Sequence, residues 1–234
     1  MATLTDHPIT KRWPARHPDR IQLYSFPTPN GIKVSAALEE LGLAYEAHTV
    51  HIGRDDQLTP EFLALNPNNK IPAIIDPDGP GGEPLALWES GAILLYLAEK
   101  TGKLMPQDPA ARWETTQWLM FQMGGLGPMF GQMGHFYKFM AGKVSDAYPT
   151  ERYVKESRRL TGVLDQRLDG RDYVMGAEYS IADIAIWPWL STAIRFYESG
   201  EAMGISDFPR ALAWWERCAE RPASQKAANI PPRE

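Results

Sequence analysis

Residues 66–97 read NPNNKIPAIIDPDGPGGEPLALWESGAILLYL, and the first half of the chain is organised around this stretch. Ile71-Pro72 opens the apolar run 73–75, which is typical of a buried strand. A proline has no N–H for a sheet ladder, so it belongs at the first residue or the edge of a strand. The Ile71–Pro72 bond is also a candidate for cis geometry, which would leave the main chain of Ile71 free to pair with an extended peptide.

A second feature of this stretch is Glu89-Ser90-Gly91, which stands directly before the apolar run 92–97. The pattern predicts the first turn of a helix, where free N–H groups and the positive end of the helix dipole suit a carboxylate ligand. A main-chain clamp at Ile71 and an anion site at residues 89–91 together fit a small peptide with a free carboxylate. Each motif alone is also common as a purely structural feature.

The flanking sequence predicts a domain over residues 21–101. Gly42 follows a run of apolar residues at helical spacing, where it is typical of a helix C-terminus. Strand and helix patterns follow one another in a regular order: strand 21–25, helix 32–41, strand 45–50, helix 59–66, strand 72–75, strand 85–87 and helix 89–101. This order predicts a thioredoxin-like α/β domain with a βαβ unit at its start.

The order of these elements and two local runs, NPNNKIPAI and ESGAILLYLAEK, resemble the glutathione-binding half of the glutathione S-transferase family. The resemblance is greatest to the bacterial Nu-class, which is similar in fold to a yeast prion-type nitrogen regulator. It implies a thioredoxin-like N-terminal domain followed by an all-α C-terminal domain. It also implies glutathione as the bound cofactor, one or two molecules per subunit, in a homodimer.

The loop 26–31 lies at the N-terminus of the first predicted helix, where redox relatives of the thioredoxin fold carry a Cys-x-x-Cys motif. This chain has Thr28-Pro29-Asn30 there, so no protein thiol can form a covalent intermediate at that position. A hydroxyl and an amide at a helix N-terminus can instead hydrogen-bond a bound thiolate and lower its pKa. The resemblance assigns this role to Thr28 and Asn30.

Alternatives to this assignment stay open. Thr28 on its own would cap the helix, and Asn30 would make a turn. Tyr24 and Ser25 are competitors, because other transferase classes use a tyrosine or a serine near this strand end. Packing within the sheet is the expected role of Tyr24.

The resemblance also assigns the remaining contacts to glutathione. Gln57 and Lys70 match positions near the glycyl carboxylate, although a loop glutamine and an exposed lysine are equally ordinary. The main chain of Ile71, with Pro72, would pair with the cysteinyl segment.

Glu89 would take the γ-glutamyl ammonium, and the hydroxyl and N–H of Ser90 the γ-glutamyl carboxylate. Arg152 matches an arginine that relatives place near glutathione from the neighbouring subunit. A single arginine on a charged helix is also commonly solvated.

The second half of the chain predicts helices only, in an all-α domain over residues 111–234 after a linker at 102–110. Its run GGLGPMFGQMGHF, residues 124–136, contains enough glycine and proline to end or kink a helix. One interpretation is a kinked helix whose small residues leave room for cofactor and acceptor, with four residues at the mouth: Gln132, His135, Phe136 and Tyr137. The other interpretation is close helix packing.

Several further features of the chain are expected to be structural. Ser180-Ile-Ala-Asp183 is a capping box with Asp in place of the usual Glu. Residues 208–221 predict the last helix, with Cys218 packed inside it. Residues 1–20 predict a polar extension, draped on the surface or disordered, and residues 230–234 a tail.

Composition excludes several classes of function. A net charge of −5 gives no general attraction to nucleic acid or acidic lipid. No apolar run approaches the roughly 20 residues that a membrane span needs. The five histidines form no metal set with carboxylates. A single cysteine excludes an internal disulfide and makes a reducing cytoplasm the expected location.

Two chemistries suit a stabilised glutathione thiolate. It could reduce a small disulfide, the sulfurs being supplied by glutathione, and the Nu-class motifs favour this activity with weak conjugation or peroxide reduction beside it. It could also attack an electrophile, as in a conventional transferase. A third possibility is a non-catalytic regulatory protein that binds glutathione on the same fold.

Overall fold

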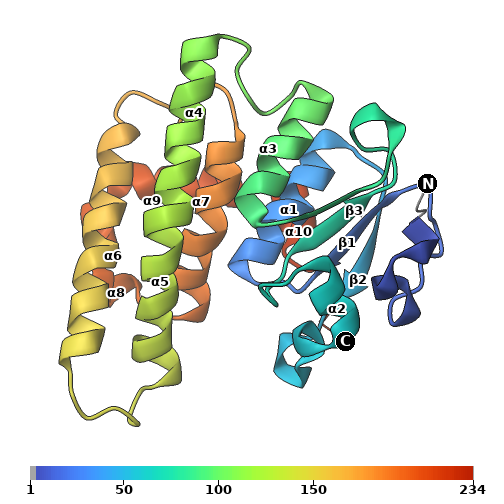
Figure 1. The fold of residues 1–234 in the computed structure, drawn as a ribbon. Coiled ribbons are helices and arrows are strands. Elements are labelled where there is room, and N and C mark those ends of the chain that lie inside the picture. The colour runs from blue at the N-terminus through green and yellow to red at the C-terminus, as the bar shows by residue number, and fades with distance from the viewer. Residues whose placement is uncertain (1–3, 234) are drawn as a thin grey trace. The chain divides into compact units, whose positions relative to one another are not determined.

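The computed structural model describes residues 4–233, so Met1–Thr3 of the expected extension and Glu234 at the chain end lie outside the described residues. The chain divides into two compact units. The first unit comprises the chain up to Thr101 together with the residues from Pro222 onward, and the second unit is Gly102–Arg221. Figure 1 labels the helices and strands of both units.

The first unit is built on a four-stranded mixed sheet in the order β2-β1-β3-β4. β1 pairs in parallel with β2, with Leu23 opposite Ala47, and antiparallel with β3, with Leu23 opposite Ile74. β4 closes the other edge antiparallel to β3. The strands are β1 (Ile21–Ser25), β2 (Tyr45–Thr49), β3 (Ala73–Asp76) and β4 (Leu85–Trp88).

Three helices connect these strands in the predicted βαβαββα order, which confirms the thioredoxin-like fold. α1 (Pro29–Leu41) follows β1, α2 (Pro60–Leu65) precedes β3, and α3 (Ser90–Thr101) follows β4. α1 and α3 pack against each other (Figure 1). α1 ends at Gly42, whose positive φ of 65° is the left-handed conformation expected of a helix C-terminus.

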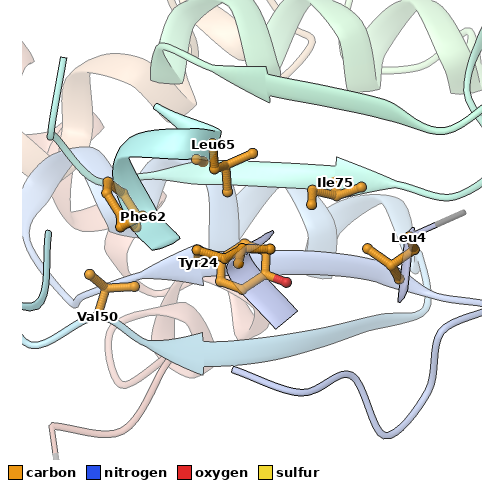
Figure 2. Close-up of a cluster of buried hydrophobic side chains, with 8 residues drawn as sticks. Leu4, Tyr24, Val50, Phe62, Leu65 and Ile75 are labelled. Atoms are coloured by element: carbon orange, nitrogen blue, oxygen red, sulfur yellow. The ribbon is translucent and has the colours of Figure 1, made fainter. Parts of the chain in front are cut away.

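The expected extension forms part of the hydrophobic core of the first unit. Two short 3₁₀ helices, Leu4–Asp6 and Pro8–Lys11, bring Leu4 and Ile9 into a cluster with α2 and the sheet, shown in part in Figure 2. Ile9 is fully buried. Burial of an aliphatic side chain of this size contributes about 1.5–3 kcal/mol, so the described part of the extension is held in place by its own core residues.

Polar contacts fasten the same segment to β2. The indole N–H of Trp13 donates to the carbonyl of Thr49 over 2.9 Å. Glu46 accepts hydrogen bonds from the main-chain N–H groups of Arg16 and His17, at 3.0 and 2.8 Å. Burial alone would raise the pKa of Glu46, but these hydrogen bonds from His17 and Arg16 outweigh it and hold the pKa below its usual value.

The chain end also differs from the expected domain organisation. The helix predicted at 208–221 is α9 (Pro209–Ala219), and a further helix, α10 (Pro222–Ala227), packs on α1 in the first unit. An ion pair of 2.8 Å between Lys226 and Glu39 joins them. The Ser35 hydroxyl donates to the Ile230 carbonyl over 3.0 Å, so residues expected to form a tail are bound to α1.

The second unit is helical, as predicted. Its helices are α4 (Pro109–Phe121), α5 (Gly127–Gly134), α6 (Tyr148–Arg167), α7 (Ile181–Ser191), α8 (Gly200–Met203) and α9. The capping box at the start of α7 is confirmed, and Asp183 also accepts a hydrogen bond of 2.8 Å from the indole of Trp214. Cys218 is fully buried in α9.

The glycine-rich run does not end its helix. A π-helical segment, Gln122–Leu126, carries α4 into α5, and such segments are a recognised cause of helix kinks. A Cβ on Gly134 would lie 2.1 Å from the ring of Tyr197, and one on Gly131 would lie 3.4 Å from the ring of Trp189. Close packing therefore explains these two glycines.

None of the helices in the described part of the chain combines the length and hydropathy that a membrane span requires.

Candidate functional site

The first unit contains a cavity of about 260 Å³ beside the strand-opening proline. Six of the residues that line this cavity were predicted for the site from the sequence, and the structure brings them together. The cavity is lined by Asn30, Asn66, Lys70, Ile71, Pro72, Glu89 and Ser90.

One wall of the cavity is the turn before β3. The Ile71–Pro72 peptide bond is cis, as the sequence predicts, and Pro72 is buried. Asn66, which the sequence analysis did not single out, shapes this turn. Its amide donates to the Lys70 carbonyl over 2.6 Å, and its side-chain oxygen accepts from the Asn68 N–H over 2.9 Å.

Another part of the cavity is lined by residues at the N-terminus of α3. Glu89 is exposed and has a φ of 72°, a conformation that is rare outside glycine. Such backbone strain concentrates at functional sites. Ser90 follows as the first residue of α3 and is buried, 3% exposed. An accessible carboxylate therefore stands next to a buried hydroxyl and the N–H groups of a helix start.

A buried lysine stands beside these groups. Lys33 of α1 is fully buried, and its ammonium donates to the Ser90 hydroxyl over 3.3 Å. Burial lowers the pKa of Lys33 to about 7, and the Glu89 carboxylate opposes part of that shift. The sequence analysis did not select Lys33. Its only sequence signal is a charged residue between the apolar positions 32 and 34.

Thr28 and Asn30 occupy the first turn of α1. Asn30 lines the cavity. The Thr28 side-chain oxygen accepts from the Gly31 N–H over 3.3 Å, which confirms the capping role of this residue. Capping uses a lone pair of the oxygen and leaves the O–H as a donor, so it is compatible with a hydrogen bond to a bound thiolate.

The two competitors for this role lie elsewhere. Tyr24 is fully buried and stacks on His48 with 4.7 Å between ring centroids, which confirms its packing within the sheet. Burial, followed by the charge of Glu46, raises the pKa of Tyr24. Ser25 is also fully buried and donates to the Phe26 carbonyl over 3.4 Å. Neither side chain lines the cavity.

Gln57, like Thr28, does not line the cavity. It is half-buried in the 3₁₀ helix Asp56–Leu58, and its amide donates to the Ile52 carbonyl at 3.5 Å. The Asp56 carboxylate beside it accepts from the His51 N–H over 2.9 Å and pairs with Arg12.

The remaining predicted residues lie in the second unit. Phe136 stacks on Tyr153 with 5.6 Å between ring centroids, and His135 meets Phe136 edge-on at 5.0 Å. Gln132 and His135 are exposed, and Tyr137 is half-buried. A second cavity of about 550 Å³ lies here, lined by Met129, Tyr148, Arg152, Tyr153, Lys155, Glu156 and Arg159.

In residues 4–233, no group of three or more His, Cys, Asp and Glu side chains is placed to hold a metal ion.

Comparison with known proteins gives the same two-part division. Residues 28–100 match the N-terminal domain of glutathione S-transferases, and residues 128–222 match the C-terminal domain. The disulfide-bond oxidoreductase YfcG of Escherichia coli is 47% identical over 208 residues, which cover 88% of this chain and 94% of the relative.

Two solved structures are similar over nearly the whole length. A Burkholderia graminis glutathione transferase with two glutathione molecules per subunit has a TM-score of 0.98 and 59% identity, covering 100% of this chain and 98% of that chain. A Pseudomonas putida glutathione transferase with one glutathione disulfide per subunit has a TM-score of 0.96 and 58% identity, covering 98% and 99%.

Proposed function

This chain belongs to the glutathione S-transferase family, and on that basis we propose that it reduces small disulfides with the thiolate of bound glutathione. The observation that carries the proposal is the cavity, where a helix start with Asn30 faces a turn and a carboxylate suited to a short zwitterionic peptide. The names of the relatives support the reaction, since YfcG is a disulfide-bond oxidoreductase.

We propose the following orientation for glutathione in the cavity. The exposed Glu89 carboxylate takes the γ-glutamyl ammonium, and Ser90 with its N–H takes the γ-glutamyl carboxylate. The main chain at Ile71, beside Pro72, pairs with the cysteinyl segment. The glycyl carboxylate lies toward Lys70, and Gln57 contributes after its amide leaves the Ile52 carbonyl.

The chemistry needs no protein thiol. Thr28 and Asn30 donate hydrogen bonds that stabilise the glutathione thiolate. The thiolate attacks one sulfur of the disulfide substrate, forming a mixed disulfide and releasing the first thiol. A second glutathione thiolate then attacks the glutathione sulfur of that mixed disulfide, so the products are glutathione disulfide and a second thiol.

We propose a Nu-class homodimer in a reducing cytoplasm, in which Arg152 approaches the glutathione of the neighbouring subunit. The aromatic pair of Phe136 and Tyr153 lies beside the second cavity and offers an apolar surface. Four residues of this region hold the disulfide substrate: Gln132, His135, Phe136 and Tyr137.

The test is an assay of purified protein for glutathione-dependent reduction of 2-hydroxyethyl disulfide, coupled to glutathione reductase. Conjugation of an aryl halide is measured in parallel on the same protein. Fast disulfide turnover with weak conjugation supports the proposal. Fast conjugation alone would make the protein a conventional transferase, and glutathione binding without either reaction would make it a regulatory member of the family.

A further inference from the structure

We propose that the disulfide substrate is an anion, with a carboxylate that lies beside Lys155 in the second cavity. The inference rests on the proposed function and narrows its substrate to the disulfides of small mercapto acids. The cavity of about 550 Å³ is formed by residues of α5 and α6, and its volume is in the range of sites that hold small molecules.

An aromatic pair connects this cavity to the residues proposed to hold the substrate. Phe136, one of those four residues, stacks on Tyr153 with 8° between the ring planes. Tyr153 in turn lines the cavity, together with Met129 and the exposed Tyr148. A disulfide that lies against Phe136 can therefore extend the free end of its carbon chain along these largely apolar side chains.

The cavity is also lined by basic side chains of α6. Arg152, Lys155 and Arg159 follow one another at intervals of three and four residues, which places side chains on the same face of a helix. Among the described residues that line the cavity, Glu156 alone is acidic. The lining is therefore positively charged.

The acidic side chain is paired with one of these cations. The two carboxylate oxygens of Glu156 accept from the guanidinium of Arg159 at 2.7 and 2.8 Å. The proposed function assigns Arg152 to the glutathione of the neighbouring subunit. Lys155 forms no hydrogen bond or ion pair with any of residues 4–233, so its ammonium is the cation left for a carboxylate of the substrate.

The overall charge of the protein works against binding of an anion. A net charge of −5 repels anions in general, so a preference for an anionic substrate has to come from local charges. Lys155 is exposed, and physiological salt screens its field over about 8 Å. The effect is therefore confined to groups in or beside the cavity, where an exposed ion pair changes an equilibrium by about two- to fivefold.

The experiment compares three small disulfides that differ in charge: 3,3′-dithiodipropionate, a dianion; 2-hydroxyethyl disulfide, which is neutral; and cystamine, a dication. Each kcat/KM for glutathione-dependent reduction at neutral pH is divided by the rate constant of the uncatalysed reaction with glutathione, which removes the intrinsic reactivity of the disulfide. We expect the wild type to prefer the dianion to the dication by about fivefold or more, and added salt to reduce this preference. The absence of a preference overturns the inference.

Two charge-reversal variants locate the effect. Lys155→Glu reverses the charge at the cavity, and Lys143→Glu is the matched control at an exposed lysine of the same unit that lines neither cavity. Glutamate and lysine have similar helix propensities, so α6 should be retained. The ratio of dianion to dication activity should fall roughly tenfold in Lys155→Glu and less than about twofold in the control. An unchanged ratio in Lys155→Glu, or an equal fall in both variants, overturns the inference.

A binding measurement separates this inference from the reaction. S-methylglutathione, which has no reactive thiol, is kept at saturation, and calorimetry follows the binding of 3,3′-dithiodipropionate. The dissociation constant should be about fivefold higher for Lys155→Glu than for Lys143→Glu. Equal constants, or no binding by the wild type, overturn the inference. Binding as expected with no turnover of any of the three disulfides would instead refute the proposed function and leave the anion site in place.

Discussion

Lys33 of α1 donates a hydrogen bond over 3.3 Å to the hydroxyl of Ser90, the first residue of α3, and both side chains are buried. The two residues are 57 positions apart in the sequence. This contact joins the two helices whose N-terminal residues line the cavity. It places a positive charge in a buried position, where desolvation disfavours the charged form of Lys33, and this has a consequence for stability.

Lys33→Met is expected to stabilise the protein without ligand. The pKa of Lys33 is lowered to about 7 in the folded protein, against roughly 10.4 in an unfolded chain. The cost of burying the charge is therefore complete below pH 7 and declines as the pH rises toward 10. Removing the charge should raise the free energy of unfolding at pH 6 by on the order of 1–4 kcal/mol, and by less at pH 9.5.

Urea unfolding of both proteins at the two pH values checks this prediction. A Lys33→Met protein less stable than wild type at pH 6 would contradict the prediction.

Thr28→Ala should lower both activity and stability. Thr28 caps α1, and loss of such a cap costs about 1 kcal/mol. Loss of a hydrogen bond to the thiolate should reduce kcat/KM for disulfide reduction by about 10–100-fold. Thr28→Ser keeps the hydroxyl and is the control. Equal kcat/KM for the alanine and serine variants would remove Thr28 from catalysis.

Glu89→Gln should weaken glutathione binding without unfolding the protein. Glu89 is exposed at the cavity, and its positive φ of 72° is unaffected by an exchange that keeps the size of the side chain. A hydrogen bond between charged groups contributes about 1.5–3 kcal/mol, so the dissociation constant should rise by roughly 10–100-fold. Calorimetry with glutathione measures it, and Glu83→Gln in the exposed turn before β4 is the control.

Glu46→Gln should loosen the N-terminal segment. Glu46 accepts from the main-chain N–H groups of Arg16 and His17, and the charge strengthens both hydrogen bonds. Limited digestion with trypsin at pH 7.5 should cleave the variant after Arg12 or Arg16 several times faster than the wild type. Unchanged cleavage rates would mean that the apolar contacts of the segment alone hold it.

Asp183→Ala should destabilise the second unit strongly. Its buried carboxylate accepts from Trp214 at 2.8 Å and from the N–H groups of Val174 and Ser180 at 2.8 and 3.0 Å. Unsatisfied buried donors cost about 1–3 kcal/mol each, so a loss of about 3–5 kcal/mol is expected in chemical unfolding. Asp169→Ala, at an exposed ion pair with Arg210, should change stability by less than about 1 kcal/mol.

Local sequence patterns were sufficient for the main elements of the fold. The cap at Thr28 and the capping box at Ser180 act between residues close in sequence, and each is present in the structure. The proline at the start of β3 and the acidic start of α3 lie at the cavity for the same reason. Turn and capping preferences depend on the immediate neighbours, which a sequence displays directly.

Packing between segments far apart in the chain could not be predicted from such local patterns. The polar composition of residues 1–20 suggested a loose extension, but Leu4 and Ile9 meet Phe62 of α2 in one cluster (Figure 2). The chain end shows the same effect, because α10 packs on α1 rather than with α9. A few apolar residues decide such docking, and their partners lie far away in sequence.

By itself the sequence determined the order of the elements, the caps, the positions of the motifs that line the cavity and the absence of a cysteine in the first-half loop. Only the tertiary structure decided which polar side chains are buried and what they contact. Lys33 and Asn66 are ordinary polar residues in the sequence, but folding encloses one beside Ser90 and the other beneath the turn that holds Lys70. The physical reason is that burial and its compensating hydrogen bonds arise between segments that meet only in the folded chain.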